Sequence, residues 1–231
     1  MPDSVFFQSD APRGLKCLIS ITLVLASLCL PTYWFNIEIF RLLNGWHSPI
    51  SDVLWVSWTT MGDGYLLGII LGCFIVYHPR ITVIGLGALL ISGALTHIFK
   101  AIFPIERPAA VLEAVHVVGP VLRFGSFPSG HTAAAMSVAL TLYSFAVSRL
   151  SKFVLILAAT LVGLSRIFVG AHFPLDVVTG RLVAASSFLF CKGLLWSYLV
   201  KHVWRKPDWE NVRFRVAYRV ELIAGFGALL L

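Results

Sequence analysis

Residues 81–99 read ITVIGLGALLISGALTHIF, an apolar stretch without a charged side chain, and Lys100 follows it directly. A bilayer core needs about 20 such residues for one helical crossing. Gly85, Gly87 and Gly93 would let a neighbouring helix approach closely. The stretch therefore predicts a membrane-spanning helix that packs against others.

Similar apolar stretches recur along the chain. Together they predict six spans, over residues 15–35, 62–78, 81–99, 128–148, 153–169 and 174–200. Residues 36–47 place apolar side chains at helical spacing beside polar ones, which predicts a helix lying in the membrane interface before the second span. The expected fold is an all-α, polytopic membrane bundle that forms a single domain over residues 1–231.

The composition agrees with a polytopic membrane protein. Of the 231 residues, 58% are hydrophobic and 13% are charged, whereas about 25% are charged in an ordinary soluble domain. One soluble core of this size could not hide so much apolar surface. The same figures exclude disordered chains and disulfide-stapled secreted modules. The net charge of +7 does not come from one basic patch, so no nucleic-acid partner is expected.

Lysine and arginine are distributed unevenly between the two sides of this layout. They are in excess in the segments on the side of the N-terminus and of the tail over residues 201–231. The positive-inside rule places that side in the cytoplasm, in a bacterial-type inner (plasma) membrane. Residues 221–231 are too short to cross a membrane. They lie at the interface, pack on the bundle or begin a further span, and the interface is favoured.

Three polar segments lie at the ends of predicted spans. They read KAIFPIERP from Lys100, PSGH from Pro128 and SRIFVGAHFPLD from Ser165. The order of the spans puts all of these ends on the outer, extracytoplasmic side of the membrane. Hydropathy alone therefore gathers one set of polar side chains there: Lys100, Arg107, Ser129, His131, Arg166, His172 and Asp176.

The cations in this set point to an anionic ligand. Arg107 and Arg166 carry planar guanidinium groups that match phosphate oxygens. Ser129 and Gly130 lie at a predicted helix start, where unpaired N–H groups and the helix dipole favour an anion. No group of Asp, Glu or Cys is placed as a metal site, so phosphoryl transfer without a metal or other cofactor is expected.

The two histidines add reactive groups to this anion site. His131 and His172 can transfer protons or attack as nucleophiles. Asp176 follows His172 by four residues and can accept its ring N–H, which fixes the tautomer of the imidazole.

Asp63, between two glycines, is expected to cap a helix. The outer loop over residues 109–127 is either a solvated connection or the part of the protein that selects the substrate.

The three segments resemble, position by position, the signature of the type 2 phosphatidic acid phosphatase superfamily, and the six-span layout resembles its membrane lipid phosphatase branch. The resemblance implies that His172 is the nucleophile and forms a phosphohistidine, that Asp176 orients it, and that His131 protonates the leaving oxygen and then activates water. It also implies a set of ligands for the phosphoryl oxygens: Lys100, Arg107, Ser129, Gly130 and Arg166.

The expected function is that of an integral-membrane lipid phosphatase. Its substrate would be a phosphomonoester or diphosphate lipid, of the undecaprenyl diphosphate, phosphatidylglycerophosphate, phosphatidate or lipid A type. A lipid-to-lipid phosphotransferase using the same phosphohistidine is the alternative. The apolar composition argues against a soluble vanadate-dependent peroxidase. A transporter or scaffold would not need His172 and Asp176 together. The oligomeric state is not indicated by the sequence.

Overall fold

The computed structural model describes residues 11–75 and 78–196. Within these residues every regular element is helical, and extended pairing is limited to an isolated bridge between Glu106 and Phe124. The all-α prediction is therefore confirmed. The tail over residues 201–231 lies outside the described residues.

Several helices begin where the sequence supplies a cap or a proline. Ser48, directly before Pro49, forms a capping box with Ser51, and the Ser148 hydroxyl accepts the N–H of Ser151. The elements in chain order are α1 (Ala11–Trp34), α2 (Asn36–Asn44), α3 (Pro49–Thr60), α4 (Gly64–Cys73), α5 (Pro79–Ile102), α6 (Pro108–Val111), α7 (Gly130–Phe145), α8 (Arg149–Phe168), α9 (Pro174–Phe190) and a π-helical segment (Cys191–Leu195).

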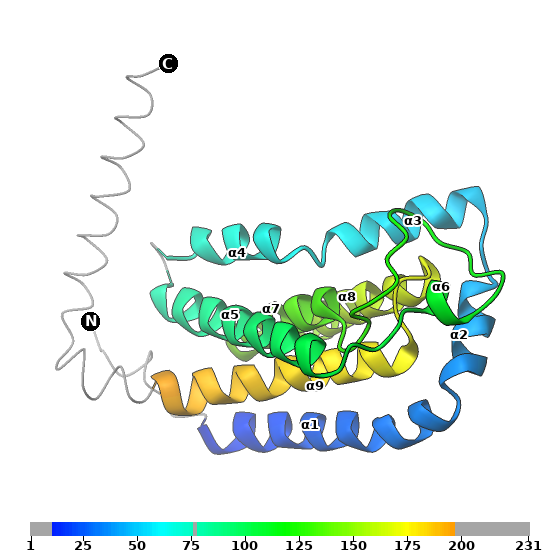
Figure 1. Ribbon diagram of the computed structural model, residues 1–231. Helices are drawn as coiled ribbons and strands as arrows, with labels where there is room; N and C mark the ends of the chain where they lie inside the picture. Colours follow the sequence, from blue (N-terminus) through cyan, green and yellow to red (C-terminus); the bar gives the residue numbers. More distant parts are fainter. Residues whose placement is uncertain (1–10, 76–77, 197–231) are drawn as a thin grey trace, which may run out of the picture.

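Helix α7 forms the centre of the bundle (Figure 1). It packs against α5, α8 and α9, and α9 in turn packs against α1. Residues 132–141 of α7 are all buried, and most are Ala, Ser or Thr, whose small side chains let the neighbouring helices approach closely. Large side chains from the other helices complete the core, among them Leu71, Ile84 and Phe188.

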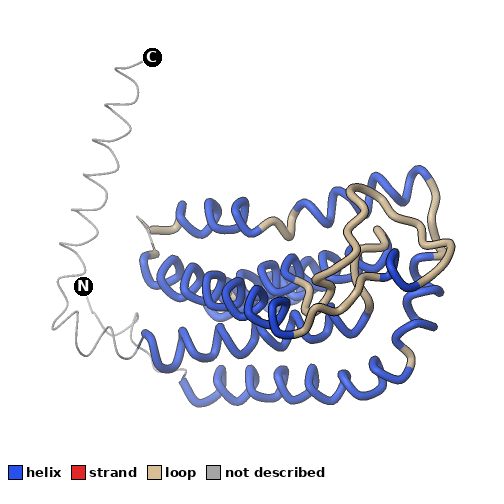
Figure 2. Tube along the Cα trace, viewed as in Figure 1, coloured by secondary structure: helices blue, strands red, loops and turns tan. Residues whose placement is uncertain are grey.

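Most of the loop structure lies at one end of the bundle (Figure 2). Helix α5 ends there at Ile102 and α8 at Phe168, while α7 begins there at Gly130 and α9 at Pro174. Because these four helices pack on one another, their ends bring the three polar segments into one region.

Three described segments are long and apolar enough to cross a membrane, namely Arg80–Ile102, Arg149–Phe168 and Pro174–Leu195. A fourth candidate is the bent pair of Thr22–Trp34 and Asn36–Asn44, with an angle of 86° between the two parts. The predicted helix over residues 36–47 is thus present as α2. Its place in the interface and the count of six spans stay predictions.

The second predicted span, over residues 62–78, contains the short apolar helix α4, and its crossing of the membrane stays a prediction. A break divides α4, which has 10 residues, from α3, which ends at Thr60 before the predicted span begins. Asp63 causes the division, because its carboxylate accepts the N–H groups of Tyr65 and Leu66 and starts a new helix. The expected cap at Asp63 is therefore confirmed.

Candidate active site

The turn that ends α8 fixes the position of His172. The backbone N–H groups of Ala171 and His172 both donate to the carbonyl of Arg166, at 3.0 and 3.1 Å. Gly170 has a φ of +73°, and a Cβ atom there would collide with the carbonyl oxygen of His116. A helix C-cap therefore holds His172 close to the backbone of Arg166.

The imidazole of His172 lies between Asp176 and Arg107. Its Nδ1 atom is 3.5 Å from Oδ2 of Asp176, a contact that falls short of hydrogen-bond geometry. Its Nε2 atom is 3.5 Å from Nη1 of Arg107. Burial lowers the pKa of His172 to about 4, although Asp176 acts in the opposite direction. The ring is therefore neutral near pH 7, so one nitrogen keeps a lone pair for attack.

Two donors hold the carboxylate of Asp176 in the first turn of α9. The N–H of Phe173 donates to Oδ2 at 2.9 Å, and the hydroxyl of Ser126 donates to the same oxygen at 2.6 Å. The N–H of Ser129 donates to the backbone carbonyl of Asp176 at 3.0 Å. These bonds join the start of α9 to the start of α7 beside His172.

The Arg107 guanidinium is held by backbone carbonyl groups. Nε donates to Phe124 at 3.0 Å, Nη2 to Gly125 at 3.3 Å and Nη1 to Ala171 at 3.1 Å. Three of its five N–H donors are therefore committed to the protein. The predicted phosphate ligand is thus a rigid cation beside Nε2 of His172, with donors left for an anion.

Ser129 directly precedes α7, and Gly130 and His131 begin it. Within the described structure no side chain caps this helix, so the N–H groups of its first turn suit an anion. The buried hydroxyl of Ser129 accepts a 2.9 Å hydrogen bond from Thr132, and its own proton can be donated elsewhere. His131 lies within electrostatic range of Arg166.

Lys100 and Arg166 add two cations from the last turns of α5 and α8. Arg166 donates from Nη1 to the hydroxyl of Thr59 at 3.2 Å, and Thr59 lies 2.8 Å from the hydroxyl of Ser165. The Nε atom of Arg166 is buried without a hydrogen-bond partner. Lys100 lies within electrostatic range of Arg107 and Arg166. A buried unpaired donor among converging cations suits an anion.

The described side chains are a poor match for a metal ion. No three His, Cys, Asp or Glu residues between 11 and 196, the gap at 76–77 apart, are grouped as a metal site. Lys100, Arg107 and Arg166 lie within electrostatic range of one another, whereas a divalent cation is normally held by several oxygen or nitrogen ligands. This donor set favours an oxyanion.

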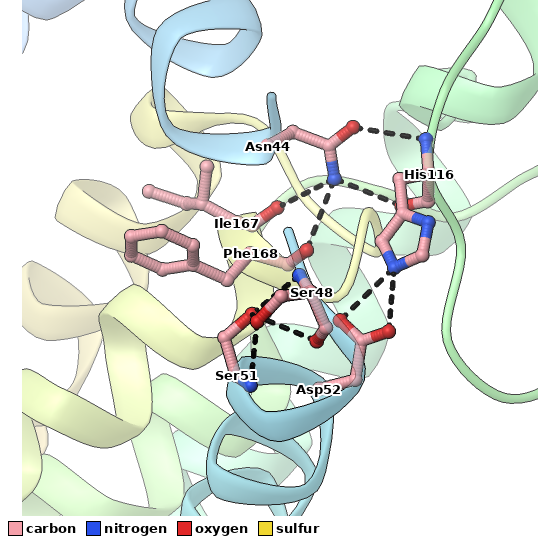
Figure 3. A network of polar contacts seen from close by, with 7 residues as sticks. All are labelled: Asn44, Ser48, Ser51, Asp52, His116, Ile167 and Phe168. Atoms are coloured by element: carbon pink, nitrogen blue, oxygen red, sulfur yellow. Dashed lines mark hydrogen bonds and ion pairs between the residues drawn. The ribbon is translucent and has the colours of Figure 1, made fainter. Parts of the chain in front are cut away.

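The sequence did not predict a polar network that fastens the outer loop to the bundle (Figure 3). Asn44, at the end of α2, donates to the carbonyls of His116 and Phe168 at 2.8 and 3.0 Å and accepts the N–H of His116 at 3.0 Å. Asp52 binds Nε2 of the same histidine at 3.0 Å. His116, expected only as a residue of the outer loop, is therefore anchored beside the C-terminus of α8.

Comparison with known proteins places these residues in a family. A model of the PAP2 superfamily matches residues 81–200, more than half of the chain and all three polar segments. The undecaprenyl-diphosphatase BcrC of Bacillus subtilis is 29% identical over 160 residues, which cover 67% of this chain and 82% of that protein. An undecaprenyl-diphosphatase of Sulfolobus acidocaldarius is 28% identical over 155 residues, or 65% of this chain and 74% of that protein.

Solved structures show the same architecture. LpxE of Aquifex aeolicus aligns with a TM-score of 0.65 and 34% identity, over 68% of this chain and 94% of that one. A PAP2-type phosphatidylglycerolphosphate phosphatase of Bacillus subtilis aligns with a TM-score of 0.61 and 22% identity, over 79% and 96%, and so shares the fold. The chain therefore belongs to the PAP2 superfamily, as its three motifs predicted.

Proposed function

We propose that the protein hydrolyses a phosphomonoester or diphosphate lipid through a phosphohistidine formed on His172. One observation carries this assignment. The neutral, buried imidazole has Nε2 beside the Arg107 cation and Nδ1 facing the Asp176 carboxylate. A nucleophile placed next to an anion-binding cation and backed by a carboxylate suits attack on phosphorus.

The phosphoryl group of the substrate occupies the space among the cations and the first turn of α7. Bound there, its oxygens meet donors that are already in place, so little rearrangement is needed as charge develops in the transition state. The proposed ligands are Lys100, Arg107, Ser129, Gly130 and Arg166.

In the first step Nε2 of His172 attacks the phosphorus, and the bond from phosphorus to the leaving oxygen breaks. His131 donates a proton to that oxygen. The imidazole of His172 gains positive charge as the phosphorus–nitrogen bond forms, and Asp176 stabilises this charge from the Nδ1 side.

In the second step a water molecule attacks the phosphohistidine. His131, now neutral, takes a proton from the water as the new phosphorus–oxygen bond forms. The phosphorus–nitrogen bond breaks, inorganic phosphate leaves, and both histidines return to their starting states. No step uses a metal ion.

The proposed setting is a single membrane domain with six crossings, made by α1, the α3–α4 pair, α5, α7, α8 and α9. The N-terminus and the tail then lie in the cytoplasm, and the site opens to the extracytoplasmic face of a bacterial-type inner membrane. The excess of Lys and Arg on the opposite side supports this orientation.

A panel of lipid phosphates tests the assignment. Purified protein is given undecaprenyl diphosphate, phosphatidylglycerophosphate, phosphatidate and lipid A, with and without an acceptor lipid, and phosphate release is measured. We expect release from at least one lipid, inhibition by vanadate, and no loss of activity with a metal chelator. A labelled phosphoenzyme that persists in His172→Ala would contradict the nucleophile, and transfer to the acceptor in place of release would favour the phosphotransferase.

A further inference from the structure

Ser126 belongs to none of the three motifs, yet it makes the shortest polar contact to Asp176. Its hydroxyl donates to Oδ2 at 2.6 Å, and both residues are buried. That oxygen also faces Nδ1 of His172 at 3.5 Å. A buried hydroxyl bound to an ionised carboxylate forms one of the stronger hydrogen bonds in proteins.

On the basis of the function proposed above, we propose that Ser126 is a positioning residue for the nucleophile. It holds the Asp176 carboxylate in the orientation that supports the His172 imidazole. Ser126 has no direct part in the chemistry, because its hydroxyl is directed at the carboxylate.

The backbone around Ser126 is fixed from two directions. Its N–H donates to the carbonyl of Ile105 at 3.0 Å. The preceding carbonyls, of Phe124 and Gly125, accept hydrogen bonds from the Arg107 guanidinium. The loop that carries the proposed phosphate-binding arginine therefore also sets the position of the Ser126 hydroxyl.

Loss of the Ser126 hydroxyl leaves Oδ2 of Asp176 with the Phe173 N–H as its remaining donor. The terminal torsion of an aspartate side chain is broad, so the carboxylate can then turn away from His172. We expect slower attack by His172 and unchanged substrate binding, since the Ser126 hydroxyl is bound to Asp176 and is not one of the proposed phosphate ligands.

The test compares Ser126→Ala with Ser137→Ala. Ser137 is also fully buried and hydrogen-bonded, to Ser92 at 3.1 Å, but it lies eight residues beyond Ser129 along α7, about 12 Å at the rise of a helix. Single-turnover phosphorylation of His172 should slow roughly tenfold to hundredfold in Ser126→Ala, as expected for a hydrogen bond to a charged group, with KM unchanged. Ser137→Ala should phosphorylate at the wild-type rate.

A double-mutant cycle separates positioning from general destabilisation. In an Asp176→Ala background, Ser126→Ala should cause no further loss, because the group that it orients is absent. If Ser126→Ala does not fold, Ser126→Cys takes its place: the thiol is somewhat larger than the hydroxyl but donates only weakly, so the same loss is expected. Additive losses, or equal rates for Ser126→Ala and Ser137→Ala in an active protein, would overturn the role of Ser126. A wild-type protein that forms no phosphoenzyme would overturn the proposed function itself.

Discussion

The Nη1 atom of Arg107 lies 3.5 Å from Nε2 of His172. The same guanidinium donates to the carbonyl of Ala171, the residue directly before this histidine. Arg107 therefore binds the backbone that carries the proposed nucleophile and also faces its reactive atom. The position of His172 and the positive charge beside its Nε2 atom both depend on the planar guanidinium of Arg107, which a lysine could not reproduce.

Replacement of Arg107 should reveal this double role. We expect Arg107→Lys to lose kcat/KM almost as severely as Arg107→Ala, roughly 10²- to 10³-fold, because an ammonium group cannot bind the three carbonyls and face His172 together. Arg123→Ala is the matched control, since this exposed residue meets Arg107 through its backbone carbonyl. Steady-state phosphate release measures the effect, and near-normal activity of Arg107→Lys would show that charge alone is sufficient.

His131 should matter most when the leaving group is poor. A lipid alkoxide needs a proton as it departs, so His131→Ala should slow phosphorylation of the enzyme by about 10²- to 10⁴-fold on a lipid substrate. On an aryl phosphate with an acidic alcohol, the phosphorylation rate of the same variant should fall only about tenfold. Rapid-quench measurement of this step on both substrates decides the matter. Equal losses on the two substrates would refute the role of general acid.

Much of the fold and of the site could be predicted because the evidence for them is local in sequence. Apolar stretches revealed most of the helices, and their order put the ends of α5, α7, α8 and α9 in one region. The motif spacing also has a local cause: the His172 N–H donates to the Arg166 carbonyl across the C-cap of α8. Such features depend on neighbouring residues and so leave a pattern.

The parts that escaped prediction depend on contacts between distant segments. Ser126 and Asp176 are separated by 50 positions, and Asn44 meets Phe168 across 124 positions. A single serine or asparagine has no periodicity or spacing to mark it. Asp63 is an intermediate case, since its role as a cap was predicted but the helix α3 before it was not.

The pH dependence of phosphorylation should reflect the buried state of His172. Its lowered pKa of about 4 means that the imidazole stays neutral as pH falls from 7 to about 5 and becomes protonated, and unreactive, only below that range. An aryl phosphate depends little on the general acid and so reports mainly on His172, with a correction for the substrate's own ionisation near pH 6. Loss of rate around the ordinary histidine pKa of about 6.5 would show that His172 is not buried in this way.

Asn44 and Asp52, the two residues that hold His116, should contribute unequally to the stability of the protein. Asn44 is buried and binds backbone groups of the loop and of α8, so Asn44→Ala should lower the free energy of unfolding by about 1–3 kcal/mol. The Asp52–His116 pair is about a quarter exposed, so Asp52→Ala should cost about 0–1 kcal/mol. Denaturation in detergent compares the two variants, and an equal or larger loss for Asp52→Ala would contradict the ranking.

The orientation of the protein in the membrane can be tested with single cysteines. In a variant whose four native cysteines are replaced, Val121→Cys lies in the outer loop at a residue that is 60% exposed. We expect it to react with a membrane-impermeant thiol reagent in cells whose inner membrane is intact, because the excess of Lys and Arg places the opposite side in the cytoplasm. A cysteine placed after Lys201 should react only once that membrane is opened. The reverse labelling pattern would move the site to the cytoplasmic face, where its substrates would have to be lipids of the inner leaflet.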